Sequence, residues 1–154
     1  MKSYWLFLRS NWPLLLFGFS CVFWGNFGQS FFIGLFGDEI KQSLGLSASQ
    51  YGSTYSAATL LSALTMLWVG AFIDRWPLRR FVVFVAAGLC AACIAFALTH
   101  HLWLLALAFY GARLFGQGLL PHTGATTMAR HFSAGRGKAI SIAGTGVSVG
   151  EIVL

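Results

Sequence analysis

Two stretches of the chain, residues 42–73 and residues 81–112, contain no Asp, Glu, Lys or Arg. Each stretch is longer than the ~20 residues with which a helix crosses ~30 Å of hydrocarbon. Charged residues make up only 9% of the whole chain, against roughly 25% in soluble domains. A soluble core of this size could not bury so much apolar sequence. We therefore expect an integral membrane protein.

Five apolar segments predict transmembrane helices, because backbone groups in lipid must satisfy their own hydrogen bonds. The segments cover about residues 12–36, 51–73, 81–98, 102–128 and 138–154. The first is too long for a signal peptide and no cleavage site follows it, so we expect an uncleaved span. The last has 17 residues, about 25 Å of helix. The predicted fold is all-α, with about four and a half transmembrane helices in a chain that we expect to be incomplete.

The basic residues predict the orientation of these spans. With the first span starting inside, eight basic residues face the cytoplasm and only Lys41 faces the other side. The eight are Lys2, Arg9, Arg75, Arg79, Arg80, Arg130, Arg136 and Lys138. This asymmetry is the positive-inside pattern, and it predicts a cytoplasmic N-terminus. The formal net charge of +6 is explained by anionic lipid head groups, so no nucleic-acid partner is expected.

Polar side chains inside the spans are candidates for function. Arg113 lies near the middle of the fourth span, where a charge costs at least ~2.5 kcal/mol and must face protein or water. The other candidates are Asn26, Gln29, Gln117, His122 and Glu151.

Two interpretations of this set stay open. In a packing interpretation the amides hydrogen-bond between helices and Arg113 pairs with Glu151. In a functional interpretation Arg113 attracts an anion into a water-accessible cavity, where Glu151 or His122 handles a proton. Packing is favoured for the amides, and function for Arg113, because a bundle that only packs needs no cation there. His122 has a third option, a hydrogen bond to a carbonyl freed by Pro121.

Other patterns in the spans favour helix packing over chemistry. Gly146 and Gly150 have the small-xxx-small spacing of closely packed membrane helices. Cys90 and Cys93 form a C-x-x-C pair, but their apolar neighbours favour packing over redox or metal chemistry. We find no nucleophile–base pair, metal-ligand cluster or phosphate-binding loop in the sequence. No enzyme activity, cofactor or metal is therefore expected.

The stretch "GAFIDRWPLRR" (Gly70 to Arg80) interrupts the apolar sequence between the second and third spans. Arginines suit the negative end of a helix dipole, whereas Asp74 at the end of its own helix is mildly unfavourable. We therefore expect Asp74 to have a partner elsewhere, either an arginine or the N-terminus of another helix. Gly70, one turn earlier, is expected to let that helix approach.

This stretch resembles the signature loop between the second and third helices of the major facilitator superfamily. The motif positions are occupied by Gly70, Asp74, Arg75, Arg79 and Arg80, and Pro77 stands where the family usually has glycine. "RLFGQGLLPHTG" resembles the family's fourth-helix motif, with Arg113 and Gln117 one residue further apart than usual. "RHFSAGRGKAISIAGTGVSVGE" resembles the following connection in bacterial permeases near the monocarboxylate and oxalate–formate carriers. Gly150-Glu151 stands where the family's antiporter motif has Gly-Pro.

The resemblance implies a secondary transporter that works by alternating access, with residues 1–154 as an incomplete N-terminal half. The loop would be a cytoplasmic gate whose acid contacts the eleventh helix, on the missing C-terminal helices. The cavity would be lined by the first and fourth helices, which carry Asn26, Gln29, Arg113 and Gln117. The implied substrate is a small anion such as a carboxylate, moved with protons or in exchange across a bacterial inner membrane.

A second hypothesis stays open beside the transporter. In this alternative the chain is a small multi-span membrane subunit that packs against partner proteins and transports nothing. Its polar side chains would then only join helices.

Overall fold

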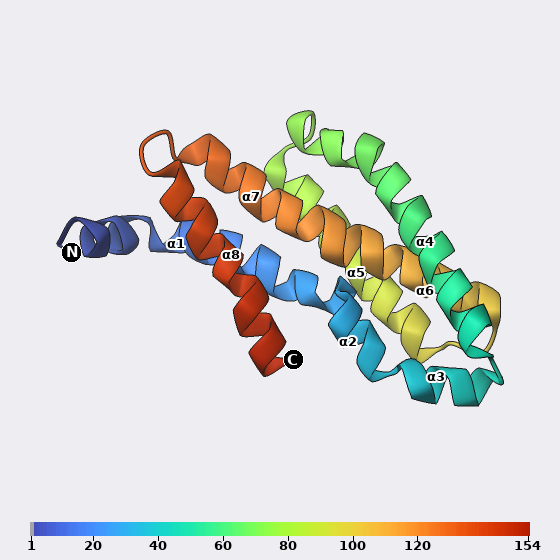
Figure 1. Ribbon diagram of the computed structural model, residues 1–154. Coiled ribbons are helices and arrows are strands. Elements are labelled where there is room, and N and C mark those ends of the chain that lie inside the picture. The colour runs from blue at the N-terminus through green and yellow to red at the C-terminus, as the bar shows by residue number, and fades with distance from the viewer. Residues whose placement is uncertain (1) are drawn as a thin grey trace.

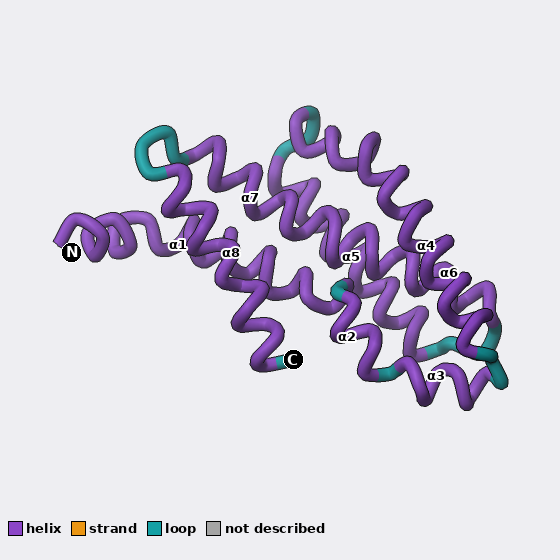
Figure 2. Tube along the Cα trace, viewed as in Figure 1, coloured by secondary structure: helices purple, strands orange, loops and turns teal. Residues whose placement is uncertain are grey.

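The computed structural model describes the backbone of residues 2–154 and the side chains of residues 5–154. The side chain of Lys2, one of the residues that predict the orientation, lies outside this described part. Within residues 2–154 every regular element is helical, and no strand occurs (Figures 1 and 2). The elements are α1 (Lys2–Trp24), η1 (Gly25–Gly28), α2 (Ser30–Leu35), α3 (Gly37–Leu44), α4 (Ala48–Val69), η2 (Gly70–Asp74), α5 (Leu78–Ala97), α6 (Leu102–Gly111), η3 (Ala112–Leu119), α7 (Leu120–His131) and α8 (Arg136–Val153).

Consecutive elements join into long apolar segments. Four of these segments in the described chain are long and apolar enough to cross a membrane: Trp5–Leu35, Ala48–Asp74, Leu78–Ala97 and Leu102–His131. The final helix, α8, has 18 residues and is not among those four. Large apolar side chains such as Trp68 and Trp103 remain 68% and 86% exposed. Such exposure is expected of surfaces that face hydrocarbon or further helices, and is unusual in water.

The first and fourth spans each contain an irregular turn that the apolar pattern does not predict. In the first span a 3₁₀ turn over Gly25–Gly28 is followed by extended backbone at Gln29 (φ −76°, ψ 151°). In the fourth span the turns over Ala112–Leu119 widen into a π-helix. Pro121 follows closely, and its ring displaces the carbonyl one turn before it. Glycine in the first span and proline in the fourth therefore account for the two irregular turns.

The fourth span, made of α6, η3 and α7, is the central segment of the bundle. Its α6 part packs against α4 and α5, η3 packs against η1, and α7 packs against α1 and α8. In Figure 1 this span runs diagonally between α4 on one side and α1 with α8 on the other. Any side chain on its middle turns therefore lies among several helices.

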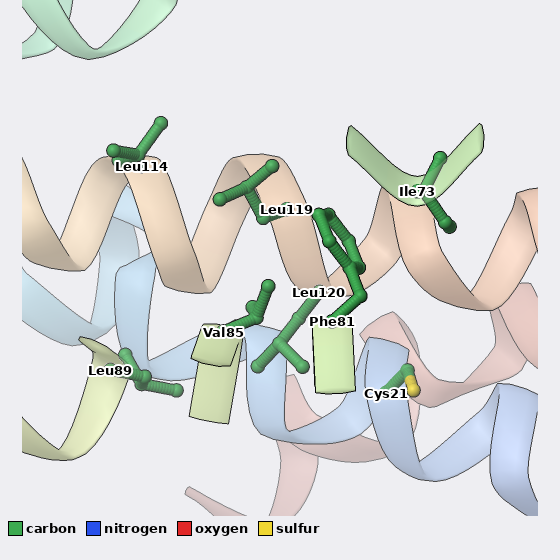
Figure 3. Close-up of a cluster of buried hydrophobic side chains, with 8 residues drawn as sticks. All are labelled: Cys21, Ile73, Phe81, Val85, Leu89, Leu114, Leu119 and Leu120. Atoms are coloured by element: carbon green, nitrogen blue, oxygen red, sulfur yellow. The ribbon is translucent and has the colours of Figure 1, made fainter. Parts of the chain in front are cut away.

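The apolar core joins helices that are far apart in the sequence. One buried cluster consists of Cys21, Ile73, Phe81, Val85, Leu89, Leu114, Leu119 and Leu120 (Figure 3). These residues come from α1, η2, α5, η3 and α7. Phe81 and Leu119 are 0% exposed. This cluster holds the signature loop and the π-helical segment to one side of α5.

Helix α8 packs closely along α1 through small residues. A Cβ at Gly146 would lie 2.7 Å from the Phe19 carbonyl oxygen, and a Cβ at Gly150 would overlap the Asn26 amide. By contrast, a Cβ at Gly144 would meet no atom within 4 Å. The small-xxx-small spacing thus marks the face of α8 that contacts α1.

This packing predicts different stabilities for two alanine variants of α8. Gly150→Ala is expected to lower the free energy of unfolding by about 1–3 kcal/mol, because the added methyl overpacks the contact with Asn26. Gly144→Ala gains the same helix propensity without the overlap. Thermal unfolding of the two detergent-solubilised variants measures the difference. Equal midpoints would contradict the close α1–α8 contact.

Candidate functional site

The backbones of the first and fourth spans touch where both are irregular. A Cβ at Gly28 would overlap the Ala112 carbonyl oxygen and lie 2.5 Å from the Gln117 backbone nitrogen. A Cβ at Gly116 would lie 2.7 Å from the Gly28 nitrogen. Only residues without a side chain permit this approach. Gly28 and Gly116 therefore bring the interrupted turn of the first span directly against the turns that carry Arg113.

Arg113 binds the interrupted turn. Its Nη1 donates to the Gly28 carbonyl oxygen and to the Ser30 hydroxyl, both at 3.2 Å. The centre of its guanidinium lies 5.4 Å from the centroid of the Tyr55 ring, in a cation–π arrangement. The Nε atom is buried and has no hydrogen-bond partner in the described chain. Arg113 thus satisfies a carbonyl that the helix break leaves free, and it keeps donors that no protein group uses.

The pairing of Arg113 with Glu151, which the packing interpretation requires, does not form among the described side chains. Within the described side chains the ion pairs are Lys41–Asp38 and Arg130–Asp74. Glu151 is exposed near the end of α8. The reason is geometric, because α8 packs on α1 and α7 and makes no comparable contact with η3. The positive charge of Arg113 therefore has no carboxylate partner in the described chain.

Asn26 takes part in helix packing. It is 1% exposed, and its Nδ2 donates to the Phe23 carbonyl at 2.9 Å and to the Gly146 carbonyl at 3.0 Å. The second bond joins the first span to α8. Its Oδ1 is buried without a partner. Asn26 therefore makes the interhelical bond of the packing interpretation, with α8 and not with Arg113.

The remaining polar candidates are spread along the fourth span and the helix break. Gln29 is half-buried in the extended backbone of the break, where its N–H donates to the Asn26 carbonyl at 2.9 Å. Gln117 is half-buried within η3. His122 points towards the second span, with its Nε2 3.8 Å from the position that a Cβ on Gly70 would take. Gln29 thus lies between Gly28 and Ser30, the two hydrogen-bond partners of Arg113, and Gln117 lies four residues after Arg113 on η3, while His122 lies near Gly70 of the signature loop.

The sequence interpretation missed Tyr55. Its hydroxyl lies 2.9 Å from the Ser30 hydroxyl, and its ring lies against Arg113. A tyrosine in an apolar span has no distinguishing pattern. No local signal could have found it, because its contact with Arg113 depends on how the second and fourth spans pack.

Asp74, the acidic residue of the signature loop, has an ion-pair partner within the described chain. Asp74 forms an ion pair with Arg130 of α7, whose Nη1 also donates to the Ile73 carbonyl at 3.2 Å. Arg75, Arg79 and Arg80 are exposed. The predicted arginine partner of Asp74 is therefore Arg130, at the end of the fourth span.

Gly70 is not needed for space in this arrangement. The nearest atom to a Cβ there would be Met66 Cε at 3.4 Å, an ordinary contact. Both Asp74 and Arg130 are about half exposed, at 62% and 47%. The ion pair is thus open to competition from another charged partner.

The family comparison agrees with this arrangement. The family model described as Major Facilitator Superfamily matches residues 15–154, which include the interrupted first span, the signature loop and the Arg113 turn. No curated protein and no solved structure matches the chain. The match covers far more than half of the sequence and confirms the family that the loop predicts. With four helices long and apolar enough to span a membrane, the chain is an integral, multi-pass membrane protein that belongs to the Major Facilitator Superfamily of transporters.

Proposed function

We propose that this chain is the N-terminal part of a secondary transporter that moves a small anionic solute, such as a carboxylate, by alternating access. The observation that carries the proposal is Arg113, a cation in the middle of a span with no carboxylate partner in the described chain. A charge at this depth is costly unless protein or water compensates it. An anionic substrate that enters from a water-filled cavity would supply that compensation. Further helices of the same protein would complete the cavity.

The same proposal places the protein in a bacterial inner membrane with its N-terminus in the cytoplasm. The exposed basic residues Arg75, Arg79 and Arg80 support this orientation. They lie at the end of the bundle where Asp74 meets Arg130. Protons remain candidate coupling ions, with His122 and Glu151 as the ionisable side chains that would carry them.

Loss of Arg113 should strongly reduce transport of an anion. In the natural full-length protein, Arg113→Ala is expected to lower carboxylate uptake at least about tenfold, because a hydrogen bond to a charged group contributes ~1.5–3 kcal/mol. Arg113→Lys keeps the charge but not the planar fork, and should retain part of the activity. Uptake of labelled lactate and oxalate into proteoliposomes measures the effect. Arg136→Ala, at an exposed arginine, is the control. Unchanged uptake by Arg113→Ala would refute the role of Arg113, and absence of uptake by the wild type would refute carboxylate transport.

For the signature loop we propose a gate in which Asp74 exchanges partners during transport. In the described chain Asp74 is held by Arg130, and both side chains are half exposed. A surface ion pair of this kind contributes only ~0–1 kcal/mol. Such a weak pair can open in each cycle, when Asp74 turns to a partner in the other half of the transporter.

The gate predicts a selective effect on turnover. Asp74→Asn and Arg130→Gln should each slow transport while leaving carboxylate affinity within about twofold, since neither side chain contacts the Arg113 turn. The double variant should be no slower than the slower single variant, because both changes remove one interaction. Asp38→Asn breaks the exposed Lys41–Asp38 pair and serves as the control. Additive slowing, or an equal effect of Asp38→Asn, would argue against the gate.

A further inference from the structure

Two hydroxyl groups lie beside Arg113 and bond to each other. The Ser30 and Tyr55 hydroxyl oxygens are 2.9 Å apart, and Ser30 also accepts a hydrogen bond from Arg113 Nη1 at 3.2 Å. Ser30 follows the break in the first span, Tyr55 lies on α4, and Arg113 lies on η3. Three different spans thus contribute to one polar cluster.

Within the described chain, this cluster lacks an acceptor for one of its two hydroxyl hydrogens. Each hydroxyl has a single hydrogen, and the bond between Ser30 and Tyr55 uses one of them, whichever residue donates. The other hydrogen is then free to donate to a third group. No acceptor for it is found within the described residues.

Arg113 adds more unused donors to the same place. A guanidinium has five N–H donors, of which the Gly28 carbonyl and the Ser30 hydroxyl take one each. Both bonds come from Nη1, and no hydrogen bond from Nη2 is found in the described chain. Nε also has no partner there, but it is buried. The cluster therefore carries a positive charge and a surplus of donors, which fits an oxyanion and would repel a cation.

The cluster is also accessible. Ser30 is exposed, and Tyr55 and Arg113 are half-buried. A ligand can reach the hydroxyls from the open side, while the Tyr55 ring holds the guanidinium in place by the cation–π contact.

We infer that Ser30, Tyr55 and Arg113 form one subsite that binds the carboxylate group of the substrate. Beside the guanidinium, the one hydroxyl hydrogen that the Ser30–Tyr55 bond leaves free donates to the carboxylate, and either residue can carry it. This inference rests on the proposed transport of an anion, and it names the side chains that recognise the anion. Arg113 supplies the charge. Either hydroxyl supplies the neutral donor, because removing one partner frees the hydrogen of the other.

This sharing predicts a non-additive response. Ser30→Ala and Tyr55→Phe should each weaken binding of lactate or oxalate by less than about threefold. The double variant Ser30→Ala/Tyr55→Phe leaves no hydroxyl hydrogen, and it should weaken binding at least about tenfold, more than the product of the single effects. Tyr55→Phe retains the ring against Arg113. Binding is measured by isothermal titration calorimetry of the full-length protein in nanodiscs.

A second hydroxyl pair provides a matched control. The Tyr110 hydroxyl donates to Thr65 Oγ1 at 3.1 Å, also between α4 and the fourth span, and no arginine adjoins it in the described contacts. Tyr110→Phe/Thr65→Val should leave carboxylate affinity unchanged. An equal loss in this control would overturn the inference, because the effect would then belong to any interhelical hydroxyl pair.

The outcomes separate the inference from the proposed function. If the Ser30/Tyr55 double variant binds like the wild type while Arg113→Ala loses binding, the hydroxyl subsite is wrong and the role of Arg113 stands. If the wild type binds a carboxylate and Arg113→Ala binds it equally well, the Arg113 role and the subsite both fail, although carboxylate transport stands. If the wild type binds neither lactate nor oxalate, the proposed substrate class fails and the inference fails with it.

Discussion

The hydrogen bond from Arg113 to the Gly28 carbonyl is the interaction on which the centre of this bundle depends. A helix interrupted inside a membrane leaves backbone carbonyls that lipid cannot satisfy. The close approach of Gly28 and Gly116 brings the fourth span near enough for Arg113 to reach one of them. Arg113 donates to a carbonyl that the helix break leaves free, and the break provides a polar neighbour for the arginine. Each feature therefore lowers the free-energy cost of the other at this depth.

The polar side chains of the spans therefore divide into two groups. Asn26 joins the first span to α8 through the Gly146 carbonyl, which is an ordinary packing role. Arg113, Ser30 and Tyr55 form an open cluster with unused donors. Helix packing needs no such surplus, and an anion-binding cavity does. At the other end of the fourth span, Arg130 holds Asp74 of the signature loop, so one helix connects the proposed binding site and the proposed gate.

Features of the fold and the site that come from local sequence patterns were predictable, whereas contacts between helices distant in the sequence were not. Charge-free runs set the helical membrane fold, and the spacing of Gly70, Asp74 and the arginines identified the family. The turn at Gln29 and the π-helix before Pro121 were not predicted, because the polar residues there were interpreted as candidate functional side chains and not as signs of a helix break. The pairing of Asp74 with Arg130, and the approach of Tyr55 to Arg113, depend on how distant helices pack, which no local pattern encodes. The exposed position of Glu151 on α8 depends on the same packing.

The contact between Arg113 and Gly28 can be measured directly by solid-state NMR in lipid bilayers. Protein labelled with ¹³C at glycine carbonyls and ¹⁵N at arginine side chains would report any glycine carbonyl carbon within about 4.5 Å of a guanidinium nitrogen. The 3.2 Å hydrogen bond predicts a dipolar dephasing signal that disappears in Arg113→Lys, because lysine carries no guanidinium label. Identical dephasing in the two proteins would show that Arg113 does not bind the interrupted turn, and would contradict the account.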